Sequence, residues 1–593
     1  MPYVVTRSCC ADASCVLACP VNCIHPAPGE PGFATAEMLY VDPDGCVDCG
    51  ACATACPVDA IKPHTALGDD ELAYADINAG YYDVFPHRDR TPVAVVPPQR
   101  RLRDPRPVRV AVVGAGPAGL YAADELLKHP EVSVDVLDRL PTPHGLVRAG
   151  VAPDHQDTKR AQELFARIES ERGFGYLLGV EVGRDVSAAE LQERYDAVVW
   201  STGASSDREL GLPGEQLAGS LSATALVGWY NAPPDHRDLP VDLSAAATRG
   251  RAVVVGTGNV ALDVARVLTA DPDELRATDI AEPAWAALAG SGVREVVVLG
   301  RRGAAHAAYT LPELLGLAAL AEGGRLNVVV DDGGGGLGDD RRAEVLARLA
   351  ARPLDPSLRT VVLRFCAAPV RLLGHDRVSG LEVRRTDAEG RPAGGTEVVD
   401  TGLVLRSIGY RSLPVPGLPF DAASATVPHE RGRVEPGTYV AGWLKRGPTG
   451  FIGTNKTCAA ETVESLLDDL DAGLVAAPVL GVGGPDDLRA LLARRGVSVL
   501  DRDDWRAVDA EERRRGRAAG RVRSKIVDPA EVVRVAGLAR LSRPGDGYDP
   551  ARKVLDGEGG ARWRATRRRA RTAARPAGTG TTRSAASASS TPR

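Results

Sequence analysis

The stretch Val108-Arg109-Val110-Ala111-Val112-Val113-Gly114-Ala115-Gly116-Pro117-Ala118-Gly119 decides the fold of the larger part of this 593-residue chain. Its first six residues have the composition of a buried parallel strand. The glycines that follow predict a tight turn into a helix whose N-terminus faces a pyrophosphate. Asp138, at the end of the next apolar strand, stands where a ribose hydroxyl would be bound. The predicted dinucleotide contacts are Gly114, Gly116, Pro117, Ala118, Gly119 and Asp138.

A second strand and glycine turn follow later in the chain. The apolar run at 252–255 leads into Gly256-Thr257-Gly258-Asn259-Val260-Ala261, with alanine in place of the third glycine. The next apolar strand ends in two arginines and offers no acidic residue for a 2′-hydroxyl. Arginines suit a 2′-phosphate, which favours NADP over NAD; mere surface charge is the alternative. The predicted contacts are Gly256, Gly258, Asn259, Val260, Arg301 and Arg302.

The cysteines gather at the N-terminal end, where nine of the eleven precede residue 57. The run Cys46-x-x-Cys49-x-x-Cys52-x-x-x-Cys56-Pro57 has the spacing of bacterial ferredoxins, in which the fourth cysteine ligates the other cluster. A zinc site would need only four ligands, usually as two separated pairs. Crossing the fourth ligands predicts one complete 4Fe–4S cluster, held by Cys19, Cys46, Cys49 and Cys52.

The first cysteine run is incomplete, because Asp12 stands where its second cysteine belongs. The crossed arrangement assigns Cys9, Cys15 and Cys56 to the second cluster, with Asp12 facing the fourth iron. Carboxylate holds iron less well than thiolate. We therefore expect a 3Fe–4S cluster, or a 4Fe–4S cluster with one labile iron. Asp12 as a solvated loop residue is the alternative, and Cys23 is expected to pack as a small apolar residue.

Composition excludes several classes of protein. Hydrophobic residues make up 44% and the formal net charge is −6, so bulk charge does not indicate a nucleic-acid binder. No apolar run reaches the roughly 18 residues of a membrane span. The N-terminus lacks the pattern of a secretory signal. A cytoplasmic location, where thiols stay reduced and can bind metal, is expected.

Two families resemble separate parts of the chain. Residues 1–62 resemble two-cluster bacterial ferredoxins of the seven-iron type, which implies a small βαββαβ fold. From about Val108 to Leu470 the chain resembles the adrenodoxin-reductase-like ferredoxin–NADP reductases. The motifs that carry this second likeness are His144-Gly145-Leu146-Val147-Arg148, Gly150-Val151-Ala152-Pro153-Asp154-His155, Pro213-Gly214-Glu215, Gly300-Arg301-Arg302-Gly303, Gly442-Trp443 and the run 446–456. The whole chain resembles the actinobacterial fusion of the two.

The reductase resemblance implies roles for further residues. It implies FAD at the first site, NADP(H) at the second, and flavin contacts from Gly145, Leu146, Val147, Trp443, Gly450, Phe451 and Ile452. It also implies that His155 and Glu313 lie close to the nicotinamide, where they orient the rings or handle protons. A purely structural histidine is the alternative for His155. The chain departs from the family at Leu315-Gly316, where a charged pair is expected.

These observations predict an α/β fold with two Rossmann-like dinucleotide-binding domains in a glutathione-reductase-like layout, preceded by a small α+β bacterial ferredoxin domain. The expected order is a ferredoxin domain at 1–75, a proline-rich linker at 76–107, an FAD-binding domain at 108–206 and 401–475, an NADP-binding domain at 207–400, a helical extension at 476–560 and a basic disordered tail at 561–593.

The expected function is ferredoxin–NADP reductase activity, with electrons passing from NADPH through FAD to the clusters. A downstream ferredoxin or cytochrome P450 is the expected acceptor. An electron-input subunit like the small subunit of glutamate synthase is an alternative. A disulfide reductase is disfavoured, because only Cys366 and Cys458 remain after residue 57. An iron–sulfur redox sensor leaves the two nucleotide sites unexplained.

Overall fold

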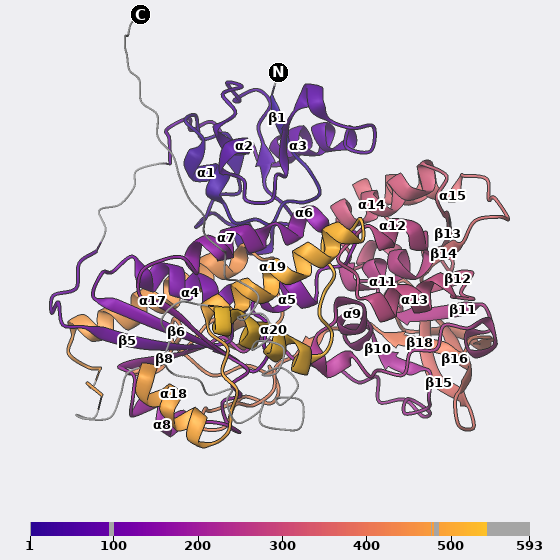
Figure 1. Ribbon diagram of the computed structural model, residues 1–593. Coiled ribbons are helices and arrows are strands. Elements are labelled where there is room, and N and C mark those ends of the chain that lie inside the picture. The colour runs from indigo at the N-terminus through magenta and orange to yellow at the C-terminus, as the bar shows by residue number, and fades with distance from the viewer. Residues whose placement is uncertain (1, 94–99, 476, 479–484, 543–593) are drawn as a thin grey trace, which may run out of the picture. The chain divides into compact units, whose positions relative to one another are not determined.

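The computed structural model describes residues 2–93, 100–475, 477–478 and 485–542 (Figure 1). The tail expected at 561–593 lies outside the described residues, as does the end of the extension expected at 476–560. Within the described part, two six-stranded sheets and a smaller N-terminal region carry the predicted sites. No helix among the described residues is both long enough and apolar enough to span a bilayer.

The N-terminal region has the βαββαβ order that the ferredoxin resemblance implies. Strand β1 pairs antiparallel with β4, and β2 pairs with β3. The elements are β1 (Tyr3–Val5), α1 (Ser14–Ala18), β2 (Ile24–His25), β3 (Tyr40–Val41), α2 (Ala51–Ala55) and β4 (Ile61–Pro63), with 3₁₀ turns at Phe33–Thr35 and His64–Ala66.

A helix occupies the start of the segment that was expected to be a linker. Helix α3 (Ala73–Val84) packs on this region. The buried Asn78 side chain accepts the amide hydrogens of Val5 and Val41, and the Tyr82 hydroxyl donates to the carbonyl of Tyr40. The helix therefore satisfies backbone groups of two short strands. The prolines that suggested a linker begin only at Pro86.

The first large sheet forms around the stretch at 108–119. Its order is β20-β21-β8-β5-β6-β7, and β5 lies parallel to both β6 and β8. The chain leaves after β8 and returns at β20, so two distant stretches build one sheet. The elements are β5 (Val108–Val113), β6 (Val132–Asp138), β7 (Phe174–Leu178), β8 (Ala197–Trp200), β20 (Arg433–Glu435), β21 (Thr438–Val440), α4 (Pro117–Leu127), α5 (Gly145–Ala149), α6 (Gln156–Lys159), α7 (Ala161–Ile168), α8 (Ala188–Gln192), α16 (Trp443–Arg446) and α17 (Thr454–Asp471).

The second large sheet is wholly parallel, in the order β10-β18-β11-β12-β14-β13. A separate antiparallel sheet, β15-β16-β17, and the pair β9-β19 adjoin it in sequence. The elements are β9 (Ser206–Asp207), β10 (Ser220–Ser222), β11 (Arg251–Val255), β12 (Glu295–Leu299), β13 (Asn327–Asp331), β14 (Thr360–Arg364), β15 (Ala367–Gly374), β16 (Val378–Thr386), β17 (Pro392–Val399), β18 (Leu403–Arg406), β19 (Tyr410–Arg411), α9 (Ala223–Asn231), α10 (Ala245–Thr248), α11 (Asn259–Thr269), α12 (Pro272–Arg276), α13 (Glu282–Ala289), α14 (Leu311–Glu322) and α15 (Arg341–Ala350), with 3₁₀ turns at Pro234–His236 and Ala304–His306.

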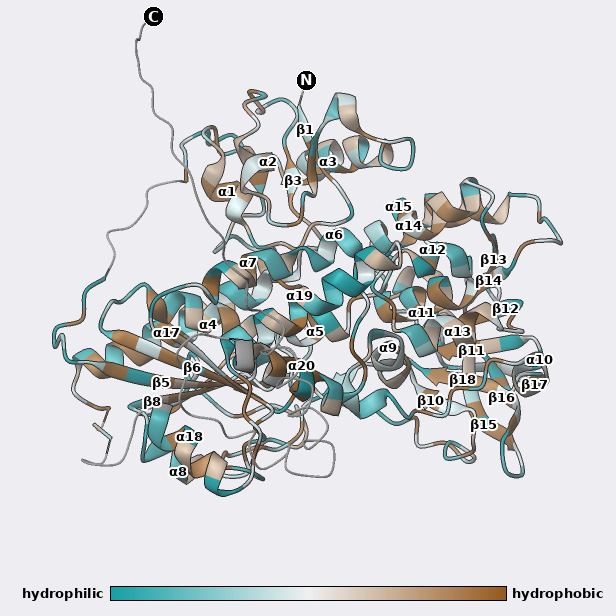
Figure 2. Cartoon of the chain, viewed as in Figure 1, coloured by the Kyte–Doolittle hydropathy of each residue, from teal (hydrophilic) through white to brown (hydrophobic). Residues whose placement is uncertain are grey.

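Three helices follow α17: α18 (Pro485–Arg494), α19 (Arg502–Ala518) and α20 (Pro529–Ser542). Helix α19 is strongly polar, and its hydrophilic colour is visible in Figure 2. Its buried residues Trp505, Val508, Glu512 and Gly516 recur at helical spacing on one side. This side contains a buried glutamate, which needs charged partners in the protein.

Candidate functional site

The first glycine turn has the geometry that a bound pyrophosphate requires. Gly114 has φ +114°, and a Cβ on Gly119 would collide with the carbonyl oxygen of Gly114. Gly116 is the N-cap of α4, with Pro117 at the first position of the helix. The Asp138 carboxylate accepts the amide hydrogens of Ala115 (2.8 Å) and Leu140 (2.9 Å). The turn thus presents a helix N-terminus beside a fixed carboxylate, which fits a dinucleotide.

The segments that the reductase resemblance assigns to the flavin converge on this turn. Gly145 packs so closely against Gly116 that a Cβ on Gly145 would overlap the Cα of Gly116. In the same way, a Cβ on Gly442 would overlap the side chain of Ala118. Val147 is buried and Leu146 is exposed, whereas Trp443 donates from Nε1 to the carbonyl of Thr449. Gly450, Phe451 and Ile452 immediately precede α17, whose N-terminus provides a second positive end of a helix dipole.

The second glycine turn lies at the carboxyl end of β11. Gly258 is the N-cap of α11 and has open space where a Cβ would stand, so backbone can approach a ligand there. Val260 follows in the first turn of α11, and the side chain of Asn259 accepts the amide hydrogen of Thr310. Arg301 and Arg302 are exposed beyond the end of β12, and within the described chain neither side chain forms an ion pair. Two unpaired guanidinium groups at this edge fit the 2′-phosphate of NADP.

His155 and Glu313 are brought into one partly buried cluster. The Nε2 atom of His155 lies 3.9 Å from Oε2 of Glu313 and 3.6 Å from Oδ1 of Asp263. Arg266, itself 2% exposed, donates to Glu313 (2.9 Å) and to Asp154 (2.9 Å), and also contacts His155 and Asp263. Helices α11 and α14 and the start of α6 therefore meet here.

The contacts of the cluster define the protonation of His155. Guanidinium groups donate only, and two of them face Nε2, so this atom must carry its lone pair. Burial, and then the charge of Arg7, lowers the pKa of His155. The pKa of Glu313 is lowered to about 2: burial opposes the charged form, but Arg266 and Arg7 outweigh it. The site combines a neutral imidazole with an ionised carboxylate, a pair that can hold or pass one proton.

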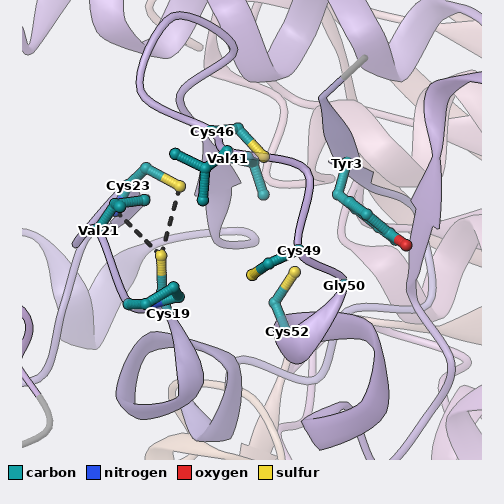
Figure 3. Close-up of a pocket in the computed structure, with 11 residues that line it drawn as sticks. Tyr3, Cys19, Val21, Cys23, Val41, Cys46, Cys49, Gly50 and Cys52 are labelled. Carbon is teal, nitrogen blue, oxygen red and sulfur yellow. Dashed lines mark hydrogen bonds between the residues drawn. The ribbon is translucent and has the colours of Figure 1, made fainter.

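Four predicted cluster ligands line a single pocket of the N-terminal region (Figure 3). Cys19 follows α1, Cys52 lies in α2, and Cys46 and Cys49 precede it. The other lining residues are mainly apolar or small. Cys23 is buried as expected, and its sulfur also lies 3.4 Å from that of Cys19. Four thiols around such a pocket fit a 4Fe–4S cluster.

The second predicted set is also close-packed. Cys9, Asp12 and Cys56 all act electrostatically on the buried Cys15 thiol. Asp12 is 7% exposed and accepts hydrogen bonds from the amide and the hydroxyl of Ser14, which lies at the start of α1. It is therefore not a solvated loop residue. Burial is the larger cause that raises the pKa of Cys9, Cys15 and Cys56, and the charge of the Asp12 carboxylate raises the pKa of each thiol further.

Burial strongly affects the pKa of these thiols when no metal is bound. It raises the pKa of Cys9 to about 11 and that of Cys52 to about 12. In Cys19 the hydrogen bond from Cys23 is the larger effect and lowers the pKa. Thiolates are needed to bind iron, so cluster assembly must release protons from these sites.

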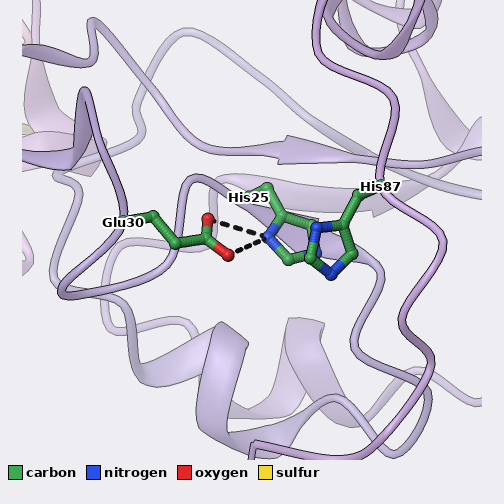
Figure 4. Close-up of side chains that lie close together, drawn as sticks. All are labelled: His25, Glu30 and His87. Atoms are coloured by element: carbon green, nitrogen blue, oxygen red, sulfur yellow. Dashed lines mark hydrogen bonds and ion pairs between the residues drawn. The ribbon is translucent and has the colours of Figure 1, made fainter.

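A group of two histidines and a glutamate lies nearby in the same region (Figure 4). The His25 Nδ1 atom lies 3.0 Å from Glu30 Oε2, and its Nε2 lies 3.1 Å from the carbonyl oxygen of Asn22. The His87 ring stacks on His25 with centroids 3.6 Å apart. Both His25 nitrogens face acceptors and the two rings are in contact at an interplanar angle of 35°, so the group links β2 to the residues after α3.

The N-terminal region contacts the segment before α17 directly. The amide of Gly453 donates to the carbonyl oxygen of Cys10 (2.8 Å), and a Cβ on Gly453 would collide with Ala11 and Asp12. Cys10 is buried together with residues of the first sheet region, including Val147 and Ile452. The loop that contains two predicted ligands of the second cluster therefore lies against the predicted flavin segment.

Sequence reasoning missed Arg7, Asp154 as an ion-pair partner, Asp263 and Arg266. Asp263 and Arg266 are one turn apart on α11, directly after the second glycine turn, and a charged pair inside an otherwise apolar helix face was the available signal. Arg7 offered none, because its partners lie 148 and 306 residues away in the chain.

Comparisons with known proteins agree with this geometry. Residues 108–293 match the family model described as pyridine nucleotide-disulphide oxidoreductase, and residues 39–62 match that of the 4Fe-4S binding domain. A probable ferredoxin/ferredoxin–NADP reductase of Mycobacterium tuberculosis is 50% identical over 566 residues, which are 91% of this chain and 96% of that protein. The NADPH-ferredoxin reductase FprA of Mycobacterium leprae is 42% identical over 450 residues, 72% of this chain and 98% of its own. The solved structure of Mycobacterium tuberculosis FprA in complex with NADPH is 40% identical, with a TM-score of 0.66, and covers 73% of this chain and all of that one.

Proposed function

The chain belongs to the family of ferredoxin/ferredoxin–NADP reductases, and we propose on this premise that it transfers electrons from NADPH through FAD to its own iron–sulfur clusters. When bound, FAD would accept a hydride from NADPH together with one proton, and would then release two electrons one at a time and two protons. The observation that carries the proposal is the contact between Gly453 and Cys10, which joins the predicted flavin segment to a predicted cluster loop.

The two dinucleotide sites take different cofactors in this proposal. FAD binds at Gly114–Gly119, Asp138, Gly145–Val147, Trp443 and Gly450–Ile452, where two helix N-termini and a buried glycine contact converge. NADPH binds at Gly256–Val260, with Arg301 and Arg302 on its 2′-phosphate. The relative FprA holds NADPH in its solved structure. The chain accordingly divides into an N-terminal ferredoxin domain, a discontinuous FAD domain and an NADP domain at about 207–400.

His155 and Glu313 lie at the nicotinamide in this proposal. Their shared cluster includes residues of α11, the helix after the second glycine turn. It also includes the start of α6, which lies in the segment after the first glycine turn. The neutral Nε2 of His155 accepts hydrogen bonds, while Glu313 stays ionised. Together they orient the ring that gives up the hydride and hold the proton that accompanies electron transfer.

The clusters differ in their ligands. Cys19, Cys46, Cys49 and Cys52 hold a 4Fe–4S cluster, in agreement with their shared pocket. Cys9, Cys15 and Cys56 hold a 3Fe–4S cluster, or a 4Fe–4S cluster with a labile iron next to Asp12, since carboxylate is the weaker ligand. A downstream ferredoxin or a cytochrome P450 receives the electrons.

An anaerobic titration of the iron-replete protein with NADPH tests this function. Absorbance should show the loss of oxidised flavin. EPR should show signals of reduced clusters that grow before the amount of added NADPH exceeds the molar amount of protein. EPR of the oxidised protein and its iron content distinguish the 3Fe–4S form from two complete clusters. A flavin that is reduced while the clusters stay oxidised would contradict the internal transfer.

A further inference from the structure

Arg7, a residue of the ferredoxin part, enters the nicotinamide cluster of the reductase part. It follows β1 in the loop that leads to α1. One nitrogen, Nη2, lies 2.7 Å from His155 Nε2 and 2.8 Å from Glu313 Oε2. Its side chain is 27% exposed, so most of the charge is removed from water. This single guanidinium therefore contacts both residues that the proposed function places at the nicotinamide.

The Arg7 guanidinium packs against Gly316 of helix α14. A Cβ on Gly316 would overlap the guanidinium in its present position, so the glycine leaves space for the side chain there. Gly316 lies one turn after Glu313, on the same side of α14. It is also one of the two positions where the sequence departs from the charged pair expected of the reductase family.

Two further contacts hold the ferredoxin part at the start of α14. The Glu37 carboxylate accepts the amide hydrogen of Leu311 (2.9 Å), and the Tyr74 hydroxyl donates to the carbonyl of Pro312 (3.3 Å). A carboxylate at a helix N-terminus is favoured by the helix dipole. Three segments of the ferredoxin part, at Arg7, Glu37 and Tyr74, thus contact Glu313 and the two residues before it.

We propose that Arg7 is a positioning residue for flavin reduction by NADPH, through which the docked ferredoxin completes the reductase site. This inference rests on the proposed function. The guanidinium keeps Nε2 of His155 as a hydrogen-bond acceptor and ties Glu313 in place. When the ferredoxin part moves away, the site loses one of its two cations and the imidazole becomes easier to protonate.

The charges that face His155 decide the direction of a pH effect. They are Arg7 before α1, the neighbouring residue Asp154, Asp263 and Arg266 on α11, and Glu313 on α14. Tyr230 on α9 interacts with Asp154, Asp263 and Arg266 of the same cluster. Arg7 and Arg266 disfavour imidazolium, whereas the carboxylates favour it. Removal of Arg7 therefore raises the pKa of His155.

The test compares Arg7→Gln and Arg7→Lys with a matched control, Arg160→Gln. Arg160 pairs with Asp59 (2.9 Å), so it is also a contact between the ferredoxin and reductase parts, but it is exposed and no contact links it to His155. Stopped-flow absorbance gives the rate of flavin reduction by NADPH against pH. Titration calorimetry gives the affinity for NADP⁺ against pH without turnover.

Arg7→Gln should slow flavin reduction about tenfold to a hundredfold, the scale of a misplaced reacting pair. It should also move the His155 limb of both pH profiles to higher pH. Arg7→Lys should keep that limb near its wild-type position, and Arg160→Gln should resemble wild type. Equal losses in the glutamine and lysine variants with an unmoved limb would show that Arg7 only supports docking. If wild-type flavin is not reduced by NADPH at all, the proposed function fails first.

Discussion

At the residue scale, the proposed selection of NADPH over NADH depends on Arg301 and Arg302, which follow the end of β12. Both are exposed, and their backbone is held by two hydrogen bonds: the Thr386 hydroxyl donates to the carbonyl of Arg301, and the Cys366 amide donates to that of Arg302. Fixed backbone and free side chains suit a phosphate that arrives with the substrate. A charge-assisted hydrogen bond of this kind contributes about 1.5–3 kcal/mol.

Arg301→Ala combined with Arg302→Ala should raise KM for NADPH by more than tenfold and leave KM for NADH nearly unchanged, because only NADPH has the 2′-phosphate. Steady-state kinetics with a dye acceptor measures both constants. Arg184→Ala is the matched control, since Arg184 is an exposed arginine in the first half of the reductase part. Equal increases for the two nucleotides would rule out the phosphate role.

Among the helices, α19 shows how the C-terminal extension is joined to the flavin segment. Glu512 is fully buried and accepts from Arg148 (2.7 Å), Arg523 (2.8 Å) and the amide of Ile526 (2.9 Å). Arg148 ends the motif at 144–148, and its guanidinium also lies over the ring of Trp505. One glutamate therefore connects α5, α19 and the segment that follows α19.

Glu512→Gln should open α19 locally, at a cost of about 3–5 kcal/mol, because it leaves buried guanidinium groups without their anion. Hydrogen exchange of α19 peptides measures this. Glu511→Gln is the control: Glu511 pairs only with Arg514 and Arg515 on its own helix, worth about 0–1 kcal/mol. Unchanged exchange in Glu512→Gln would contradict the anchor.

The ion pairs of Glu512 with Arg148 and Arg523 depend on pH in a defined direction. Burial raises the pKa of Glu512, but Arg148 and Arg523 outweigh it and hold the pKa below its ordinary value. The ion pair therefore stabilises fully above about pH 4, the ordinary range for glutamate, and its contribution is lost as pH falls through the lowered pKa. The difference in exchange between wild type and Glu512→Gln should shrink in that acidic range.

At the scale of the whole chain, the described segment before residues 94–99 forms an ion pair with the ferredoxin part, and the described segment after them forms ion pairs with the reductase part. Arg90 pairs with Asp42 of the ferredoxin part, whereas Arg100 pairs with Asp468 and Asp471 of α17. A tether of this kind keeps two parts at an effective concentration in the millimolar range. Transfer between the flavin and cluster sites should then take place within one molecule.

Cluster reduction after mixing with NADPH should therefore be first order, with a rate constant independent of protein concentration. Stopped-flow traces over a tenfold or larger dilution series, supported by freeze-quench EPR, measure it. A rate constant that rises in proportion to protein concentration would show that electrons pass between molecules, against the contact of Gly453 with Cys10.

Short-range patterns in the sequence were enough to predict two nucleotide sites and two cluster sites. The strand and turn at 108–119, the second turn at 256–261 and the cysteine spacings each depend on residues close together in the chain, so local geometry sufficed. The convergence of Cys19 with Cys46, Cys49 and Cys52 followed from the crossed ligand pattern, and the four residues line a common pocket. Helix α3 was missed because its stabilising contacts are long-range bonds of Asn78 and Tyr82 to distant strands.

Folding alone brought together the residues that complete the sites. Arg7 meets His155 and Glu313 across separations of 148 and 306 residues, and Arg148 meets Glu512 across 364. No periodicity or motif links such positions, because each side chain is an ordinary charged residue in its own segment. Their roles depend on packing, which removes these side chains from water. Inside the protein an unpaired charge is costly, so each of them pairs with the partner that the fold places beside it.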